Sequence, residues 1–115
     1  MNDRVFKLSP FLQPAPGEPI RSVVTQTPDA NVVAWFVHPG QRITPHSHPH
    51  GQDTWRVISG QGEYQVDALG RTVPIEAGDV VVAANGEVHG VLCTGADPLV
   101  IMSVVCPAEA GYLPF

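Results

Sequence analysis

Short apolar stretches separated by turn residues recur about every ten residues along this chain. Twelve prolines and eleven glycines interrupt them, and both residue types disfavour helix interiors. Short apolar runs between turn signals are typical of β-strands. The pattern predicts nine strands: Ile20–Gln26, Asn31–His38, Arg42–His48, Asp53–Ile58, Gly62–Asp67, Arg71–Glu76, Asp79–Ala83, Val88–Thr94 and Leu99–Cys106.

Turn signals lie between these predicted strands. Asn85-Gly86 is the strongest, because both residues tolerate positive φ. A chain of 115 residues makes one domain that buries roughly two-thirds of its unfolded surface. We therefore predict an all-β protein with a single domain over residues 1–115, built as a sandwich or barrel. The Pro-rich residues 1–19 predict an irregular N-terminal arm across the barrel.

Two predicted strands carry apolar side chains on both faces. Residues Asn31–Val37 and Leu99–Val105 lack the alternation of a strand with one solvated face. Each of these strands must be covered by the barrel interior on one side and by something else on the other. The N-terminal arm is one candidate cover, and a second protomer is the other. We predict a homodimer.

Charge and composition exclude some classes of protein. The net charge is −5, and the six Lys and Arg residues are scattered, so a nucleic-acid partner is not expected. No apolar run reaches the 18 or so residues of a membrane span, and residues 1–7 lack the apolar core of a secretion signal. Cys93 and Cys106 form no metal-binding pair or disulfide framework. We expect a cytoplasmic protein without a membrane partner.

The histidines are the candidate metal ligands in this sequence. His46, His48 and His50 occupy every second position, and His89 lies on a distant predicted strand. Residues i and i+2 of a strand face the same side, with Cα atoms roughly 6.6 Å apart. Imidazoles at that spacing can reach one ion at about 2 Å, and a distant ligand would tie two strands together. The sequence therefore predicts a metal site.

The residues around these histidines resemble the first motif of the cupin superfamily. That motif has Gly, five residues, His-x-His, three or four residues, Glu, six residues and Gly. The matching positions here are Gly40, His46, His48, Asp53 and Gly60, with Asp53 where the family has Glu.

A second stretch is similar to the second cupin motif, which has Gly, five residues, Pro-x-Gly, two residues, His, three residues and Asn. Gly78, Gly86 and His89 match, while Ala84 replaces the Pro and Cys93 replaces the Asn. The resemblance implies a small single-domain cupin, with a jelly-roll β-barrel as its fold.

The resemblance also implies a ligand set. The two histidines and the carboxylate of the first motif, with the histidine of the second, would bind one divalent metal ion. Those positions here are His46, His48, Asp53 and His89. Gln52 is the alternative fourth ligand, although the spacing to Gly60 favours Asp53. Such a ligand set suits Fe, Mn, Ni, Cu or Zn without selecting among them.

Strand alternation predicts the walls of a pocket beside this ion. If Asp53, His89 and His46 point inward, every second residue along each strand does so too. We expect a largely apolar cavity for a small substrate with an oxygen that reaches the metal. The predicted pocket residues are Trp55, Val57, Val91, Cys93 and Arg42.

The resemblance favours an oxidoreductase of the dioxygenase type, acting on a small oxygen-bearing substrate at the metal. No second inward carboxylate provides a general base, which weakens hydrolase and epimerase interpretations. The alternatives are a module that binds or senses a small ligand without turnover, and a metal-dependent isomerase or lyase. The expected partners are one divalent metal ion and a small molecule.

Overall fold

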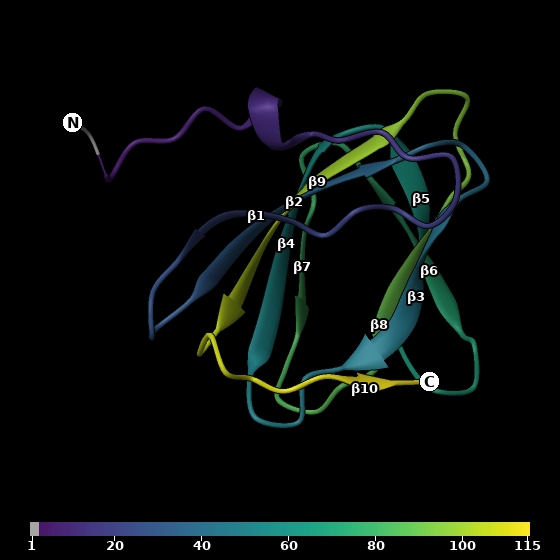
Figure 1. Cartoon of the computed structure of the whole chain (residues 1–115). Coiled ribbons are helices and arrows are strands. Elements are labelled where there is room, and N and C mark those ends of the chain that lie inside the picture. Colours follow the sequence, from purple (N-terminus) through teal and green to yellow (C-terminus); the bar gives the residue numbers. More distant parts are fainter. Residues whose placement is uncertain (1–2) are drawn as a thin grey trace.

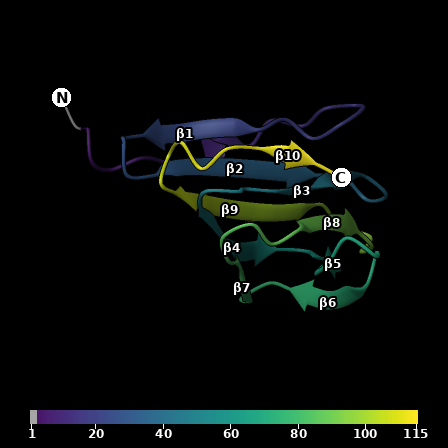
Figure 2. The same cartoon turned by 90° about the horizontal axis from the view of Figure 1, so that it is seen from below.

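Two five-stranded antiparallel sheets face each other in the computed structural model of the chain, which describes residues 3–115 (Figure 1). The first sheet has the strand order β1-β2-β9-β4-β7 and the second β10-β3-β8-β5-β6 (Figure 2). This arrangement confirms the predicted all-β jelly-roll barrel. The elements are η1 (Ser9–Phe11), β1 (Ser22–Gln26), β2 (Asn31–Val37), β3 (Arg42–Ser47), β4 (Gln52–Ser59), β5 (Gln61–Gln65), β6 (Thr72–Glu76), β7 (Val80–Ala83), β8 (His89–Cys93), β9 (Leu99–Cys106) and β10 (Leu113–Pro114).

Each of the nine predicted strands has a counterpart within two residues at either end. The sequence did not predict the 3-10 helix η1 or the two-residue strand β10, because segments this short carry no hydrophobic period. Within residues 3–115, no helix has the length and hydropathy to cross a bilayer.

The inner faces of both sheets build one apolar core. On β4, Trp55 and Val57 point inward opposite Ser103 and Ile101 of β9. Fully burying an apolar side chain of this size stabilises the fold by about 1.5–3 kcal/mol. The buried core cluster consists of Val37, Ile43, Trp55, Val57, Tyr64, Ile75, Val91, Cys93, Leu99 and Ile101.

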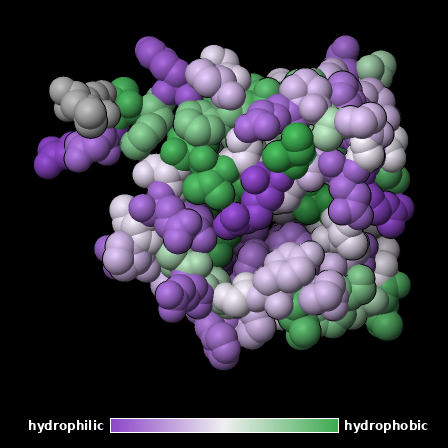
Figure 3. Space-filling view, in the orientation of Figure 1, coloured by the Kyte–Doolittle hydropathy of each residue, from purple (hydrophilic) through white to green (hydrophobic). Residues whose placement is uncertain are grey.

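The N-terminal arm is irregular, as predicted, and is fixed to the barrel at its rim. The side-chain amide of Gln41 donates to the carbonyl oxygens of Ala15, at 2.7 Å, and Gly17. Farther back along the arm, Gln13 Nε2 donates to Ser22 Oγ at 3.1 Å. Apolar side chains gather where the arm meets the strands (Figure 3). These contacts bring the end of the arm to the mouth of the barrel.

Candidate metal centre

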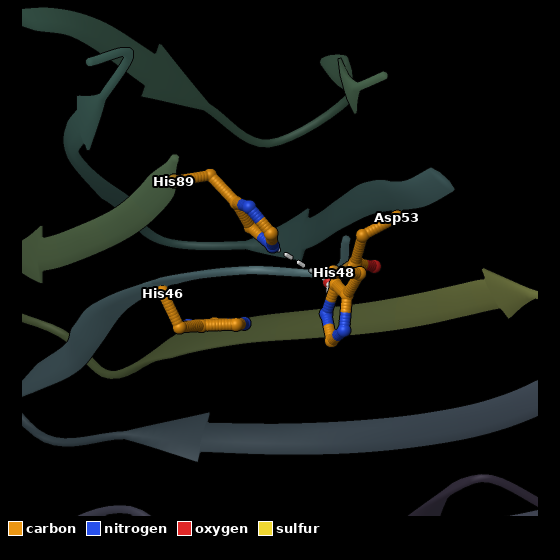
Figure 4. A group of neighbouring side chains, drawn as sticks. All are labelled: His46, His48, Asp53 and His89. Atoms are coloured by element: carbon orange, nitrogen blue, oxygen red, sulfur yellow. Dashed lines mark hydrogen bonds and ion pairs between the residues drawn. The ribbon is translucent and has the colours of Figure 1, made fainter. Parts of the chain in front are cut away.

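Three strands bring His46, His48, Asp53 and His89 to one point inside the barrel (Figure 4). We call these four residues the His3Asp cluster. His46 on β3 pairs directly with His89 on β8, and their ring centroids lie 4.3 Å apart. His48 follows the end of β3, while Asp53 reaches across from β4 in the opposite sheet. The cluster therefore ties the two sheets together.

A bulge in β3 aims His46 at this point. Ile43 pairs with Val91 and His46 pairs with His89, so the register shifts between the two pairs. Pro45 lies inside the bulge and has no N–H to donate to the ladder. Opposite it, a Cβ on Gly90 would lie only 2.8 Å from the carbonyl oxygen of Ile43, so glycine permits the close approach of β3 and β8.

The ring Nδ1 atom of each histidine faces a backbone carbonyl oxygen. His46 Nδ1 lies 2.8 Å from Thr44 O and His89 Nδ1 lies 3.1 Å from Glu87 O. His48 Nδ1 lies 2.7 Å from Gly111 O, near the C-terminus. A carbonyl oxygen only accepts, so all three contacts place a proton on Nδ1. Carbonyl contacts of this kind orient metal-ligating histidines, and they leave Nε2 directed at the cluster.

Asp53 is oriented by a buried hydroxyl. Ser103 Oγ donates to Asp53 Oδ1 at 2.6 Å, which leaves Oδ2 for the histidines. Asp53 Oδ2 lies 2.9 Å from His89 Nε2 and 3.3 Å from His48 Nε2. Ser103 was not among the site residues predicted from the sequence. The available signal was one polar residue among apolar ones on the inner face of β9.

The charges of the cluster require a cation between Asp53 and the histidines. Burial alone would raise the pKa of Asp53, but its contacts with His48, His89 and Ser103 outweigh burial and lower that pKa far below its usual range. Burial also opposes a charge on His48, yet its contact with Asp53 raises the pKa of His48 above 6.5. An Nε2 lone pair facing a carboxylate oxygen is repulsive unless a proton or a metal ion lies between them.

The cluster suits a metal ion. Its four ligand atoms lie within 4.8 Å of one another, whereas ligand atoms around an ion at about 2.1 Å are roughly 3 to 4 Å apart. A small contraction is therefore enough to close the site. His48 Nε2 is buried, and its nearest partner is Asp53 Oδ2 at 3.3 Å, a contact too poor to count as a hydrogen bond, so this atom is available to a metal ion. Burial lowers the pKa of His46 to about 4, so its imidazole is neutral at pH 7, as metal binding requires.

Two residues considered from the sequence lie outside the cluster. Gln52, the alternative fourth ligand, is exposed, and its side-chain amide donates to Thr54 Oγ1 at 3.2 Å. Because Gln52 and Asp53 are neighbours on a strand, only one of them can face inward. His50 is exposed in the turn beyond Pro49.

A cavity of about 120 Å³ lies beside the cluster, bounded by the end of the N-terminal arm and by the C-terminal segment. His46, His48 and Asp53 line it on one side. Val33, Trp35, Ile43 and Val105 are its apolar walls, and its other lining residues are Glu18, Pro19, Arg21, Arg42, Thr44, Ser103 and Tyr112.

The predicted pocket residues need a correction. Trp55, Val57, Val91 and Cys93 point inward as alternation predicts, but they pack into the closed core and do not line this cavity. A barrel of this size is just wide enough for side chains to fill. Trp55 still supports the site, because its ring meets that of His89 edge-on at 5.6 Å.

Arg42 is the one predicted pocket residue that borders the cavity. The bulge after Ile43 breaks the alternation by which Arg42 was placed on the same face as His46. Arg42 pairs with Leu92 and is exposed. The sequence also missed Arg21 and Tyr112 as lining residues, since they come from the two ends of the chain.

Residues 33–105 match a family model described as the Cupin domain. That segment contains all four residues of the His3Asp cluster. A solved structure from Klebsiella pneumoniae subsp. pneumoniae, described as an uncharacterized conserved protein with a double-stranded beta-helix domain, is 47% identical to the chain. It has a TM-score of 0.94, and the match covers 99% of each chain.

Two matches from Thermotoga maritima, one a solved structure and one a curated sequence, have names that mention oxalate. The solved structure of a predicted oxalate decarboxylase has a TM-score of 0.75 at 21% identity, covering 90% of this chain and 99% of that one, which shows the fold alone. An oxalate-binding protein is 31% identical over 67 residues, which are 58% of this chain and 54% of that protein. This second match spans only about half of that relative.

Proposed function

Because the chain belongs to the cupin family, we propose that its His3Asp cluster holds one divalent transition-metal ion and that this ion binds a small anionic ligand from the adjacent cavity. One observation carries the proposal. Three imidazole Nε2 atoms and one carboxylate oxygen converge beside an open cavity, with no protein cation among them. The donor set suits Fe, Mn, Ni, Cu or Zn.

Size and charge support a small anion as the ligand. The volume of about 120 Å³ is smaller than that of a cavity of about 150 Å³ that binds benzene, so the ligand is small. Arg21 lines the cavity, and its positive charge opposes protonation of His48. Neither Arg21 nor Arg42 forms an ion pair within residues 3–115. A carboxylate is the natural partner for guanidinium groups in this position.

The name of the oxalate-binding relative supports oxalate as the first ligand to test. Oxalate is small and flat, and it offers two carboxylates, one for the metal and one for a guanidinium. A bound divalent ion supplies Lewis-acid polarisation of the ligand oxygen. The protein supplies orientation and exclusion of water, through Trp35 and the other apolar walls.

We propose oxygen-dependent turnover as the reaction class for this site. Within residues 3–115, Glu18 is the only carboxylate besides Asp53 that lines the cavity, and Glu18 is exposed. Hydrolysis and epimerisation use a positioned acid–base pair, whereas oxidation at a metal places fewer demands on protein groups. Binding without turnover is the competing function, favoured by the small volume of the cavity.

Elemental analysis of the untagged protein, purified without chelators, tests the metal. We expect about one divalent ion per chain, and metal affinity reduced by more than about 100-fold in His46→Ala and His89→Ala, since loss of a ligand costs more than loss of its supporting group. His50→Ala, at an exposed histidine in the turn after β3, is the matched control and should bind metal as the parent does. Metal retained equally by all four proteins would overturn the site.

Calorimetry of the metal-loaded protein with oxalate tests the ligand, and Arg21→Met should weaken oxalate binding without changing metal affinity. An oxygen electrode with a panel of small carboxylates and enols then separates the two functions. Oxygen uptake that depends on metal and substrate supports the enzyme. Tight binding with no uptake supports the binding module.

A further inference from the structure

The last nine residues, 107–115, cross back over the end of β3 and the loop that follows it, which carry His46 and His48. We call them the C-terminal strap. Its strand β10 pairs with β3, placing Leu113 opposite Ser47 and Pro114 opposite His46. The backbone N–H of Phe115 donates to Pro45 O at 3.0 Å, and Ala110 O accepts from the N–H of His50 at 2.8 Å. Figure 1 shows the strap along the end of the barrel where β3 and β4 meet.

Close packing fixes the path of the strap. A Cβ on Gly51 would lie 2.4 Å from Ala110 Cβ and 2.6 Å from Cys106 O, so only glycine fits beneath the crossing. Ala110 itself is 1% exposed. Gly111 has φ of +80°, a conformation that favours glycine.

The three cluster histidines are held in two different ways. His46 and His89 each contact the carbonyl oxygen of the residue two positions earlier, Thr44 on β3 and Glu87 just before β8. His48 contacts Gly111 O, 63 residues away, at 2.7 Å. His48 lies beyond the last paired residue of β3, so the strand does not fix its ring. Gly111 of the strap therefore orients the ring of His48, as the local backbone orients the rings of His46 and His89.

The strap also places an aromatic ring against the cluster. Tyr112 stacks on His46 with centroids 5.1 Å apart and planes inclined by 26°, and its centroid lies 6.4 Å from that of His48. Tyr112 is 61% exposed, yet it lines the cavity. Its ring is thus the wall between the cluster and solvent.

We propose that the C-terminal strap is a working part of the centre: Gly111 positions His48 toward the metal ion, and Tyr112 is a specificity-determining wall that limits the size of the ligand. This inference rests on the proposed metal site. The contacts of Gly111 and Tyr112 support these roles, and both residues lie outside the two cupin-like motifs.

Cobalt(II) binding tests the role of Gly111. In Gly111→Val the side chain is incompatible with a φ of +80°, and its Cβ would lie 3.2 Å from Pro49 Cδ, so the carbonyl shifts away from His48. We expect Co(II) affinity to fall about 10- to 100-fold, with a changed visible absorption spectrum. Leu113→Ala, in the same strap and half exposed, is the control and should match the parent.

A double variant separates positioning from general damage to the fold. If Gly111 acts through His48, Gly111→Val should cost little further affinity in a His48→Ala background. Full additivity of the two changes would overturn the positioning role. A parent protein that binds no Co(II) would instead overturn the proposed metal site. Thermal unfolding of each variant shows whether the barrel is intact.

Azide, acetate and benzoate, titrated into the Co(II) protein, test the wall. Tyr112→Ala should raise benzoate affinity relative to acetate about tenfold, while Tyr112→Phe keeps the ring and the parent ratio. Each variant is titrated at saturating Co(II), so that the ratio of anion affinities reports the size of the ligand site and not the metal affinity. An unchanged ratio of benzoate to acetate affinity in Tyr112→Ala would contradict the role of Tyr112 in limiting ligand size. A parent Co(II) spectrum that none of the three anions changes would contradict it as well.

Discussion

The two ends of the barrel interior are built by the same strands but have opposite chemistry. On β4 the inner face changes from Asp53 to Trp55 and Val57, and on β8 it changes from His89 to Val91 and Cys93. One end is a ligand cluster beside a cavity, and the other is closed apolar packing. The alternation of a strand that directs core residues inward thus also directs metal ligands inward. The metal site therefore differs from the core only in having polar residues at a few inward positions.

This division predicts that the apolar end determines stability without affecting the metal. Ile101 is fully buried in the core. Ile101→Ala should lower the free energy of unfolding by about 2–5 kcal/mol, from lost burial and the remaining cavity. Urea unfolding measures the loss, and metal titration of the folded variant should give the parent affinity. Leu69→Ala, at a side chain 94% exposed, is the control. A large drop in metal affinity for Ile101→Ala would show that the two ends are coupled.

The polar end predicts a dependence of stability on pH in the metal-free protein. The pKa of His46 falls from 6.5 to about 4 on folding because of burial. Between these values the unfolded chain binds more protons, so stability is complete above pH 6.5 and is lost as the pH falls toward 4. The loss from His46 is up to about 3 kcal/mol.

His48 has the opposite sign, since its raised pKa adds stability below pH 6.5 that is lost as the pH rises through that pKa. Urea unfolding at several pH values, with His46→Gln as the comparison, isolates the larger effect. The variant should lose less stability than the parent between pH 6.5 and 4. Equal losses would contradict the assignment to His46.

The contrast between the two ends also explains what the sequence could predict. Turn signals and short apolar runs are local, so they predicted nine strands, and period-two spacing placed His46 and His48 on one side. Motif spacing favoured Asp53 over Gln52, and the cluster contains Asp53. The bulge at Pro45 lies outside any alternation rule, yet Arg42, which alternation placed beside the pocket, does line the cavity.

Contacts between distant segments were not predictable. Ser103 reaches Asp53 across 50 residues, and Gly111 reaches His48 across 63. Neither pair shares a period or a motif. The closed core around Trp55 was missed for another reason, because alternation gives the direction of a side chain but not the width of the space it enters.

Ser103 provides a prediction at the boundary between the two ends. Its hydroxyl orients Asp53, so Ser103→Ala should weaken metal binding about 10- to 100-fold by freeing the carboxylate. The exposed Ser59→Ala is the matched control and should have no effect. A chelator competition assay measures both. Metal affinity equal to that of the parent in Ser103→Ala would mean that Asp53 keeps its orientation without the hydroxyl of Ser103.

The outer face of the first sheet provides the prediction with the smallest effect on the site. On that face Ala34 of β2 and Val100 of β9 are already buried within the chain, whereas Val80 and Val82 at its β7 edge are 59% and 51% exposed. We propose that a second protomer covers these exposed valines, which would form the homodimer expected from the sequence. Light scattering should give twice the 12.3 kDa mass of the chain for the parent and one chain mass for Val82→Arg, with metal affinity unchanged. Val73→Arg, at a similarly exposed position on β6 of the other sheet, should remain dimeric. A monomeric parent would leave the exposed valines as ordinary surface residues and would separate the function of the cluster from any assembly.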